Sequence, residues 1–399
     1  MAHRASHNIV PRSAPGRARD HPGPGFSRIG RPPVVFSASL QYEISAGSGS
    51  PPISAGGIFV KTLKKLFLIV LAVFLILVVI GFLLPKTRQV ERSVLIDAPP
   101  SAVFAKVNGF RYFNDWSPFV ATMPDAEYSY VGPDFGIGSK MSWSTPEPKS
   151  ETGSQIVVAS TPYERVDVEL DLGPRGEAQV AYLLQPEDGG TRITWTFDTD
   201  FGFNLVGRYF GLLLDRNLGP LYAQGLANLK RISEELPRVD WSGIEIGIST
   251  VESTTIAYST GHCQREPADI AASLAAAYGR VAGFISTNGL QMTGQPTAIT
   301  NYWDDRGWGF DAGIPVSGSP SRGVGPDSPV RMGETYGGKV VKAIHTGPYT
   351  GLSDTRDLVE AFLLAHKLEM NGRSWEVYVS DPGNTPEAEL RTEIYYPVK

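Results

Sequence analysis

The chain has 399 residues, a length that suggests two or three domains rather than one. It carries 36 Lys and Arg residues against 41 Asp and Glu residues, a formal net charge of −5. Because its folded part contains no basic block, we do not expect nucleic acid as the main partner. The single cysteine, Cys263, excludes an intrachain disulfide. It stands beside His262, and we interpret it as a loop thiol, because one Cys and one His are too few for a zinc site.

Residues 22–261 contain neither histidine nor cysteine. This segment therefore cannot hold a Ser-His-Asp triad, a Cys-His pair or an imidazole metal site. No metal-ligand cluster, phosphate-binding loop, nucleophile elbow or helix-turn-helix module is visible in the rest of the chain. We accordingly expect no metal and no cofactor.

The chain begins with a stretch rich in Pro, Gly, Ser and Arg that shows little apolar periodicity. Such a composition cannot bury enough surface to order a backbone. We interpret residues 1–59 as a disordered extension, or as residues that precede the true start of the protein. The second interpretation rests on the sequence from Val60 onward, VKTLKKLFLIVLAVF, which reads like an ordinary bacterial N-terminus.

An apolar run from Leu66 to Leu84 contains 19 residues without one polar side chain. At about 1.5 Å per residue it covers roughly the ~30 Å hydrocarbon core of a bilayer. A buried core helix rarely stays apolar all round for this length, and no small-x-small cleavage site follows, so we predict an uncleaved transmembrane anchor over 62–84. Three basic residues flank each side; the tight cluster before the run favours a cytoplasmic N-terminus. This predicts a single-pass protein of the bacterial inner membrane with its domains outside the cytoplasm.

Residues 88–236 read as a first α+β domain. An alternating strand pattern, VERSVLI, precedes a short helical segment, APPSAVFAKV, and six further strand-like runs follow with turn signals between them. A helical pattern then runs from Phe203 to Glu235, where apolar residues recur at steps of three and four. Gly219-Pro220 is expected to kink this helix.

The order of these segments resembles the START-like superfamily, also called the SRPBCC or polyketide-cyclase-like fold. The resemblance rests on IDAPPSAVFAKVNGFRYFNDWSPF, GGTRITWTF and LGPLYAQGLANLKRISEE. It implies a helix-grip fold, in which a curved antiparallel sheet wraps a long C-terminal helix around an apolar cavity, and members bind lipids, polyketides or hormones. The residues that could line the cavity, or equally form an ordinary core, are Trp116, Tyr130, Trp143 and Trp195.

A short linker at 236–243 suggests that the next domain lies close by. Residues 243–399 contain a weak internal repeat, in which each half reads as a β-α-β-β unit. The matching segments include Thr260-Gly261 with Thr346-Gly347 and Tyr302 to Asp305 with Tyr378 to Asp381. Two such units can pair into one sheet around a shared groove.

The segments HTGPY, WEVY followed by an Asp-Pro turn, and TEIYYPV make this half similar to the gyrase-inhibitor-like effector-binding domain. In that family a glutamate just before the Asp-Pro turn sits at the floor of an aromatic pocket and meets cationic, hydrophobic ligands. Glu376 falls on this position, and its counterpart in the first half is Thr300. The predicted ligand-binding set is completed by aromatic walls at Tyr378, Tyr395, Tyr302 and Trp303.

A plainer hypothesis for Glu376 is a cross-strand ion pair with Arg391 or Lys339. His345, before a Gly-Pro turn, is expected to be a hydrogen-bonded turn residue rather than a catalyst. Our leading hypothesis is a membrane-anchored, non-enzymatic protein that binds hydrophobic, cationic small molecules, with the lipid bilayer as its partner through 66–84. One alternative is a hydrolase of strained or alkylating molecules with Glu376 as base and Tyr378 or Tyr395 as acid. Another is a ligand sensor that acts on a separate transcription regulator.

Overall fold

The computed structural model describes residues 55–146, 151–321, 325 and 327–399. The prediction for the first part of the 1–59 extension lies outside the described residues. The chain divides into two compact units between Leu66 and Phe67, inside helix α1 (Ala55–Leu83). The first unit contributes only the N-terminal part of this helix to the description, and the elements below belong to the second unit.

Two described helices are long and apolar enough to cross a membrane by length and composition, at Thr62–Leu83 and Pro267–Asn288. In α1 the large apolar side chains between Leu63 and Leu83 are mostly exposed. The second helix, by contrast, packs one face on a sheet and buries Ala277 and Val281 there. Of these two helices, only α1 is both long and apolar and left without a protein core that buries its side chains.

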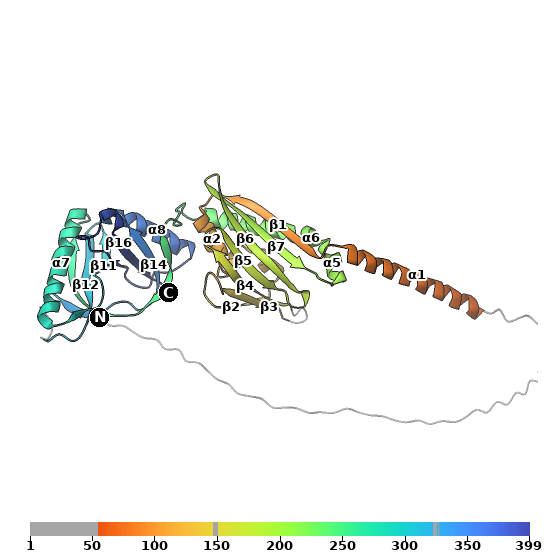
Figure 1. Cartoon of the computed structure of the whole chain (residues 1–399), viewed down its shortest axis with the longest axis horizontal. Helices are drawn as coiled ribbons and strands as arrows, with labels where there is room; N and C mark the ends of the chain where they lie inside the picture. The colour runs from red at the N-terminus through yellow and green to blue at the C-terminus, as the bar shows by residue number, and fades with distance from the viewer. Residues whose placement is uncertain (1–54, 147–150, 322–324, 326) are drawn as a thin grey trace, which may run out of the picture. The chain divides into compact units, whose positions relative to one another are not determined.

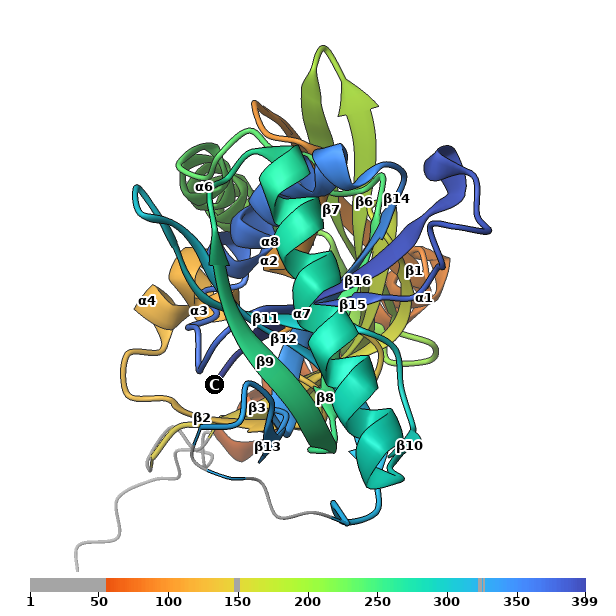
Figure 2. The same cartoon turned by 90° about the vertical axis from the view of Figure 1, so that its left-hand side faces the viewer.

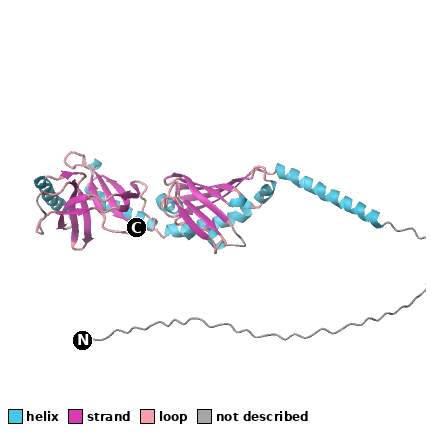
Figure 3. Ribbon diagram, turned by 90° about the horizontal axis from the view of Figure 1, so that it is seen from below, coloured by secondary structure: helices cyan, strands magenta, loops and turns pink. Residues whose placement is uncertain are grey.

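The first sheet is antiparallel throughout, with strand order β1-β7-β6-β5-β4-β3-β2. Strands β2 to β7 form a meander, and β1 pairs with β7 as an edge strand. Figure 3 shows the strands in magenta and the helices in cyan. The strands are β1 (Thr87–Ile96), β2 (Glu127–Val131), β3 (Lys140–Ser144), β4 (Thr152–Thr161), β5 (Arg165–Asp171), β6 (Glu177–Glu187) and β7 (Gly190–Asp200).

Helices of this domain lie between β1 and β2 and after β7: α2 (Pro100–Val107), α3 (Phe113–Trp116), α4 (Phe119–Thr122), α5 (Leu205–Gly211) and α6 (Leu214–Glu234). Helix α6 packs on the concave side of the sheet, where Tyr222 stacks on Trp195 with ring centroids 3.8 Å apart. Its buried Leu226 and Leu229 extend the same core. This is the helix-grip α+β arrangement that the sequence predicts.

The predicted long helix is interrupted at a different place from the one we expected. The break falls at Leu212 and Leu213, between α5 and α6, and α6 continues as helix through Pro220. Pro220 removes one helical hydrogen bond to the carbonyl of Arg216. Both residues are exposed, so water can satisfy that carbonyl, and the proline is tolerated.

The C-terminal domain is built on one large antiparallel sheet with strand order β13-β9-β12-β11-β15-β16-β14-β8, and β10 pairs with β12. Its strands are β8 (Glu245–Val251), β9 (Thr255–Cys263), β10 (Gln291–Met292), β11 (Thr297–Asp304), β12 (Gly307–Ser317), β13 (Arg331–Glu334), β14 (Gly338–Thr346), β15 (Trp375–Tyr378) and β16 (Arg391–Pro397). Two helices, α7 (Pro267–Asn288) and α8 (Leu352–Ala365), cover one face. Helix α7 packs on β9 and β12, and Figure 2 shows it in the foreground alongside β9. We call this covered face the helix face.

The strand order confirms the internal repeat. It is symmetric about the β11–β15 junction, where β9, β12 and β11 on one side mirror β14, β16 and β15 on the other. At the centre Ile299 pairs with Trp375, and the repeat-equivalent residues Thr300 and Glu376 flank this pair symmetrically. The two halves are therefore related by an approximate two-fold axis that passes beside Glu376.

The prediction that Cys263 is a loop thiol is wrong. Cys263 is the last residue of β9 and is buried, paired with Trp308 on β12, so it is a core thiol and not a loop thiol. The strand extends this far because β12 offers partners through Gly309 and Trp308.

Candidate functional site

Glu376 lies on the helix face of the sheet, at its centre. Strand alternation in β15 points Glu376 and Tyr378 toward the helices, and Trp375 and Val377 toward the opposite face. The whole residue is only 4% exposed. A carboxylate buried to this extent needs a charged or hydrogen-bonding partner.

The partner of Glu376 is Arg356, on α8. Its Nε donates to Oε1 of Glu376 over 2.9 Å, and a terminal nitrogen of the guanidinium bonds the same oxygen. The hydroxyl of Tyr378 donates to Oε2 over 3.0 Å. Both carboxylate oxygens are thus engaged by the protein itself.

The ion pairs expected for Glu376 do not form with the residues proposed. Arg391 contacts Glu393 at 3.4 Å, and Lys339 contacts Asp134 at 2.7 Å. Both of those candidates lie on strands of the same sheet as Glu376, whereas the actual cation comes from a helix packed across the sheet. Such a contact depends on tertiary packing and leaves no pattern in the strand sequence.

Aromatic residues surround the Glu376–Arg356 pair. The ring of Tyr378 meets that of Tyr349 at 5.5 Å and that of Tyr278, on α7, at 6.4 Å, both edge-on. The Arg356 guanidinium lies over the ring of Trp303 at 5.2 Å. The pair therefore sits between both helices, with rings contributed by both halves of the repeat.

Two predicted wall residues lie elsewhere. Tyr395 pairs with Trp375 and stacks on it at 4.9 Å, which places it on the face opposite to Glu376. Tyr302 hydrogen-bonds His262 at 2.9 Å, because a bulge between Thr300 and Tyr302 shifts the register of β11. The same bulge leaves Trp303 on the helix face, beside Trp308.

Of the other predicted residues, Thr300 accepts a hydrogen bond from the Trp308 indole at 3.3 Å, on the same face as Glu376. Tyr396, the neighbour of Tyr395, lies on the helix face, because its pairing alternates with that of Tyr395 along β16. A one-residue difference in register decides which tyrosine faces the site, and neighbouring tyrosines in YYP cannot be told apart by periodicity alone.

Burial controls the protonation of the tyrosines. It raises the pKa of Tyr378 well above its ordinary value, and the charge of Glu376 adds to the effect. The pKa of Tyr396 is raised to about 12, also chiefly by burial. Burial would lower the pKa of Arg356, but the adjacent Glu376 carboxylate holds it above the ordinary value. At neutral pH the site thus contains phenols that donate hydrogen bonds and a permanent cation.

His345 is the hydrogen-bonded turn residue that we expected. Its Nε2 donates to the Pro348 carbonyl at 3.0 Å, and its Nδ1 meets the Thr355 hydroxyl at 2.8 Å. Both ring nitrogens are occupied, so the ring orders the turn before α8.

The tryptophans predicted for the first domain lie in a packed aromatic cluster. Trp116 meets Trp195 edge-on at 5.1 Å, and Trp143 is buried in the same core. Tyr130 is 51% exposed on β2 and accepts a hydrogen bond from Asn114 at 3.1 Å, so it does not join them. Among the described residues no partner is found for the indole N–H groups of the three tryptophans, which leaves polar donors inside this core.

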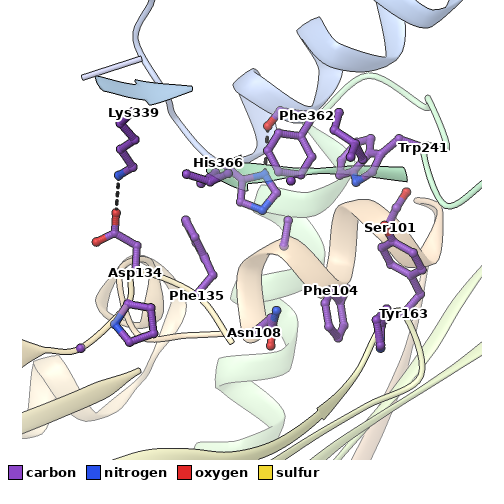
Figure 4. A pocket seen from close by; sticks show the side chains of 17 residues that line it. Ser101, Phe104, Asn108, Asp134, Phe135, Tyr163, Trp241, Lys339, Phe362 and His366 are labelled. Carbon is purple, nitrogen blue, oxygen red and sulfur yellow. Dashed lines mark hydrogen bonds and ion pairs between the residues drawn. The ribbon is translucent and has the colours of Figure 1, made fainter. Parts of the chain in front are cut away.

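A separate cavity of about 550 Å³ opens beside α2 and the end of α8. Figure 4 shows Phe104 from α2 and Asn108 just after that helix on one side, and Phe362 from α8 and His366 just after that helix on the other. Trp241, from the short linker, packs edge-on against Phe362 at 5.9 Å. The volume suits a drug-sized molecule, and the walls are largely aromatic and apolar.

Two charged or titratable features border this cavity. Lys339 and Asp134 form an ion pair of 2.7 Å at one side, drawn as a dashed line in Figure 4. The His366 ring stacks on Phe362 at 4.0 Å, and burial lowers its pKa to about 4. Glu376 does not line this cavity.

Known families match both halves of the chain. Residues 87–234 match the family described as polyketide cyclase / dehydrase and lipid transport, and residues 245–399 match the GyrI-like small molecule binding domain. No curated protein matches the chain significantly.

Solved structures resemble parts of the chain. The EcmrR C-terminal domain is 14% identical with a TM-score of 0.35, and the match covers 39% of this chain and 98% of that one. A hydrolase from Listeria innocua is 16% identical with a TM-score of 0.29, covering 39% and 92%. Ara h 8.0201 is 12% identical with a TM-score of 0.26, covering 37% and 97%.

Proposed function

We propose that this chain, which joins a START-like domain of the polyketide cyclase and lipid transport type to a GyrI-like small molecule binding domain, is a membrane-anchored protein that binds hydrophobic cations at Glu376. One observation carries the proposal: a carboxylate that is 4% exposed lies at the centre of the GyrI-like sheet, ringed by aromatic side chains from both halves of the repeat.

In the structure Arg356 already supplies the positive charge that Glu376 requires. Its guanidinium touches the carboxylate on one side and the face of Trp303 on the other. These are the two contacts that a flat organic cation would make in the same place, one ionic and one cation–π. We therefore assign Arg356 the role of an internal competitor, which a ligand must displace.

Displacement is physically accessible because Arg356 stands at the edge of the site. Its side chain is 26% exposed and the Trp303 ring next to it is 43% exposed. An arginine at such a position can rotate into water, where its charge is fully solvated. The vacated space would hold a cation whose charge again neutralises the buried Glu376.

The anchoring half of the proposal rests on α1. A helix long and apolar enough to span a bilayer, with its large side chains mostly exposed, precedes both domains. The lysine cluster before it supports a cytoplasmic N-terminus, which would place the two domains outside the cytoplasm of a bacterium. In this arrangement a hydrophobic ligand would partition into the membrane and reach the domains along its surface.

The test compares two probes of similar shape and opposite charge, tetraphenylphosphonium and tetraphenylborate. The full chain is placed in nanodiscs, and binding is measured by calorimetry against empty nanodiscs. Arg356→Met should bind the phosphonium about tenfold more tightly, ~1.4 kcal/mol, because the competing cation is gone. The double variant Arg356→Met with Glu376→Gln should lose this gain. Neither Arg356→Met nor the double variant should bind the borate more tightly than the wild type does.

Arg356→Lys is the matched control, because it keeps a competing cation and should bind the phosphonium like the wild type. Removing one partner of a buried ion pair typically costs about 3–5 kcal/mol, so Arg356→Met is expected to unfold more readily. In that case the phosphonium should raise the melting temperature of Arg356→Met more than that of the wild type. Equal phosphonium affinity in wild type, Arg356→Met and the double variant would place the ligand away from Glu376 and overturn the proposal.

The hydrolase alternative has one observation in its favour, the 3.0 Å hydrogen bond between Tyr378 and Glu376. The raised pKa of Tyr378 keeps it a poor acid, and Arg356 blocks one carboxylate oxygen. Turnover of an epoxide substrate that disappears in Glu376→Gln and persists in Arg356→Lys would support catalysis over simple binding.

A further inference from the structure

Helix α5 has its small residues inside and its large apolar residues outside. Gly207 and Gly211 are buried, and a Cβ atom on either would come within 2.8 Å of the Phe201 ring. The opposite side of the helix carries Val206 and Phe210, which are 66% and 67% exposed. This is the reverse of the pattern that a surface helix of a globular protein shows in water.

The exposed apolar side chains continue on both flanks of α5. Phe203 precedes the helix and is 84% exposed, and Leu212 and Leu213 follow it at 52% and 48%. We call these three residues together with Val206 and Phe210 the α5 patch. Contiguous exposed apolar side chains of this size normally mark a surface that is covered by another apolar body.

Helix α5 lies directly beside the end of α1. The buried guanidinium of Arg208 donates to the α1-end carbonyls of Gly81, Phe82 and Leu84 at 3.3, 3.0 and 3.2 Å. These carbonyls have no helical partner of their own, so Arg208 serves as a cap for α1. The hydroxyl of Tyr209 also donates to the carbonyl of Leu77 at 2.6 Å. Figure 1 shows α5 at the end of α1 that leads into the first sheet.

These contacts set the height of α5 along α1. The contact at Leu77 lies seven residues before the contact at Leu84, so α5 runs beside roughly the last 10 Å of the apolar helix. Helices that lie in the membrane interface bury their apolar face about 5–10 Å deep. If α1 spans a bilayer, the α5 patch is at the depth of the headgroup and upper acyl region.

Charged residues stand where such an arrangement requires them. Lys86 follows the end of α1, and Arg216 follows Leu213 by three positions; both are exposed. Their cationic ends can reach lipid phosphates while their stems lie along the apolar layer. Both are close in sequence to the apolar segments, and Asp215, which lies beside Arg216, is paired with Arg92 at 2.9 Å.

We propose that the α5 patch inserts into the outer part of the same bilayer that α1 crosses, and thereby holds the first domain against the lipid surface. The occupant is the acyl-chain layer of the membrane, because the helix that carries the patch packs against the apolar helix α1 through Arg208 and Tyr209. The inference rests on the proposed anchoring by α1. It adds a second contact with lipid, which is made by the first domain itself. Its consequence is that the START-like domain meets hydrophobic ligands at the membrane rather than in bulk water.

The test uses the full chain in phosphatidylcholine vesicles, with single cysteines labelled by an environment-sensitive fluorophore. Labels are placed at Phe210→Cys in the patch, at Phe74→Cys in α1, and at Val131→Cys on β2, whose exposure of 66% matches the 67% of Phe210. The wild-type chain, whose Cys263 is buried, is the labelling blank. Doxyl groups high on the lipid chains should quench the Phe210 label several-fold more than the Val131 label, and doxyl groups deep on the chains should quench the Phe74 label most.

Each outcome separates this inference from the anchoring on which it rests. Quenching at Phe74 with a Phe210 label no more quenched than the Val131 label would overturn the inference and leave the anchor standing. Absence of quenching at Phe74 and at Phe210 would reject both. A Phe210 label shielded from an aqueous quencher but not reached by lipid doxyl groups would show that a second copy of the chain covers the patch, which also overturns the inference.

Discussion

Buried titratable side chains in the C-terminal domain are neutralised in different ways. Glu376 is paired with Arg356, whereas His366 stays uncharged, with its Nδ1 donating to the Phe362 carbonyl at 2.9 Å. His366 lies between the rings of Phe362 and Phe135, where a positive charge would lose its hydration. Burial, and to a smaller degree nearby Lys106, lower its pKa from 6.5 to about 4.

This lowered pKa predicts acid sensitivity. Between pH 6.5 and about 4, His366 is protonated in the unfolded chain but stays neutral in the folded chain. The free energy of unfolding therefore falls as the pH falls. The loss from this one group is on the order of 3 kcal/mol and is complete near pH 4. Replacing it in His366→Phe keeps an aromatic ring in place and should flatten the fall, as measured by urea unfolding across this pH range.

The unfolding free energy of His366→Phe at pH 8 is the control, because it reports the packing change without titration. If wild type and variant lose stability in parallel between pH 6.5 and 4, His366 is not the group responsible.

Among the helices, glycines inside α6 and α7 stand in opposite environments. A Cβ on Gly225 of α6 would lie 2.8 Å from the Trp195 ring and 2.9 Å from Pro118, so α6 approaches the sheet closely only because this position lacks a side chain. Gly283 of α7 is exposed, and a Cβ there would meet nothing within 4 Å. Alanine is intrinsically favoured over glycine in a helix by about 1 kcal/mol.

The two glycines therefore predict opposite effects of one substitution. Gly225→Ala should destabilise the chain by about 1–3 kcal/mol, because overpacking outweighs the gain in helix propensity. Gly283→Ala should stabilise it by about 0.5–1 kcal/mol. Both are measured by chemical unfolding followed by tryptophan fluorescence. A stabilising Gly225→Ala would contradict the close packing of α6 against Trp195.

The elements of the C-terminal sheet were predictable where sequence periodicity is local. The β-α-β-β repeat, the equivalence of Thr300 with Glu376 and the orientation of Glu376 all follow from short-range patterns, and the symmetric pairing about Ile299 and Trp375 agrees with them. The sequence could not determine on which face Tyr302 and Tyr395 lie, and in the structure both lie on the face opposite to Glu376. A bulge in β11 inverts the alternation after Thr300, and a bulge leaves no mark in the pattern of apolar residues.

For the whole molecule, the first question is whether α1 holds the chain in a membrane. Charged residues near the middle of a membrane helix cost about 2.5–3.5 kcal/mol each. Val73→Asp together with Ile76→Asp should therefore move much of the protein from the membrane fraction to the soluble fraction after a carbonate wash. The matched control is Val131→Asp with Ile137→Asp, which places two charges at positions 66% and 63% exposed on the first domain. Release of the wild-type chain by carbonate would contradict the anchor.

The sequence by itself determined the apolar run at 66–84, the order of the two domain families and the alternation that puts Glu376 and Tyr378 on one face of β15, because these depend on neighbours within a few positions. The tertiary structure alone decided that Arg356 neutralises Glu376, that Tyr396 rather than Tyr395 lies on the helix face, and that α5 packs beside α1 while Val206 and Phe210 stay exposed. The physical reason is that the contacts between a helix and a sheet depend on how the helix is placed on the sheet. Arg356 and Glu376 are 20 positions apart and lie on different elements, so their pairing exists only once α8 has docked on the sheet.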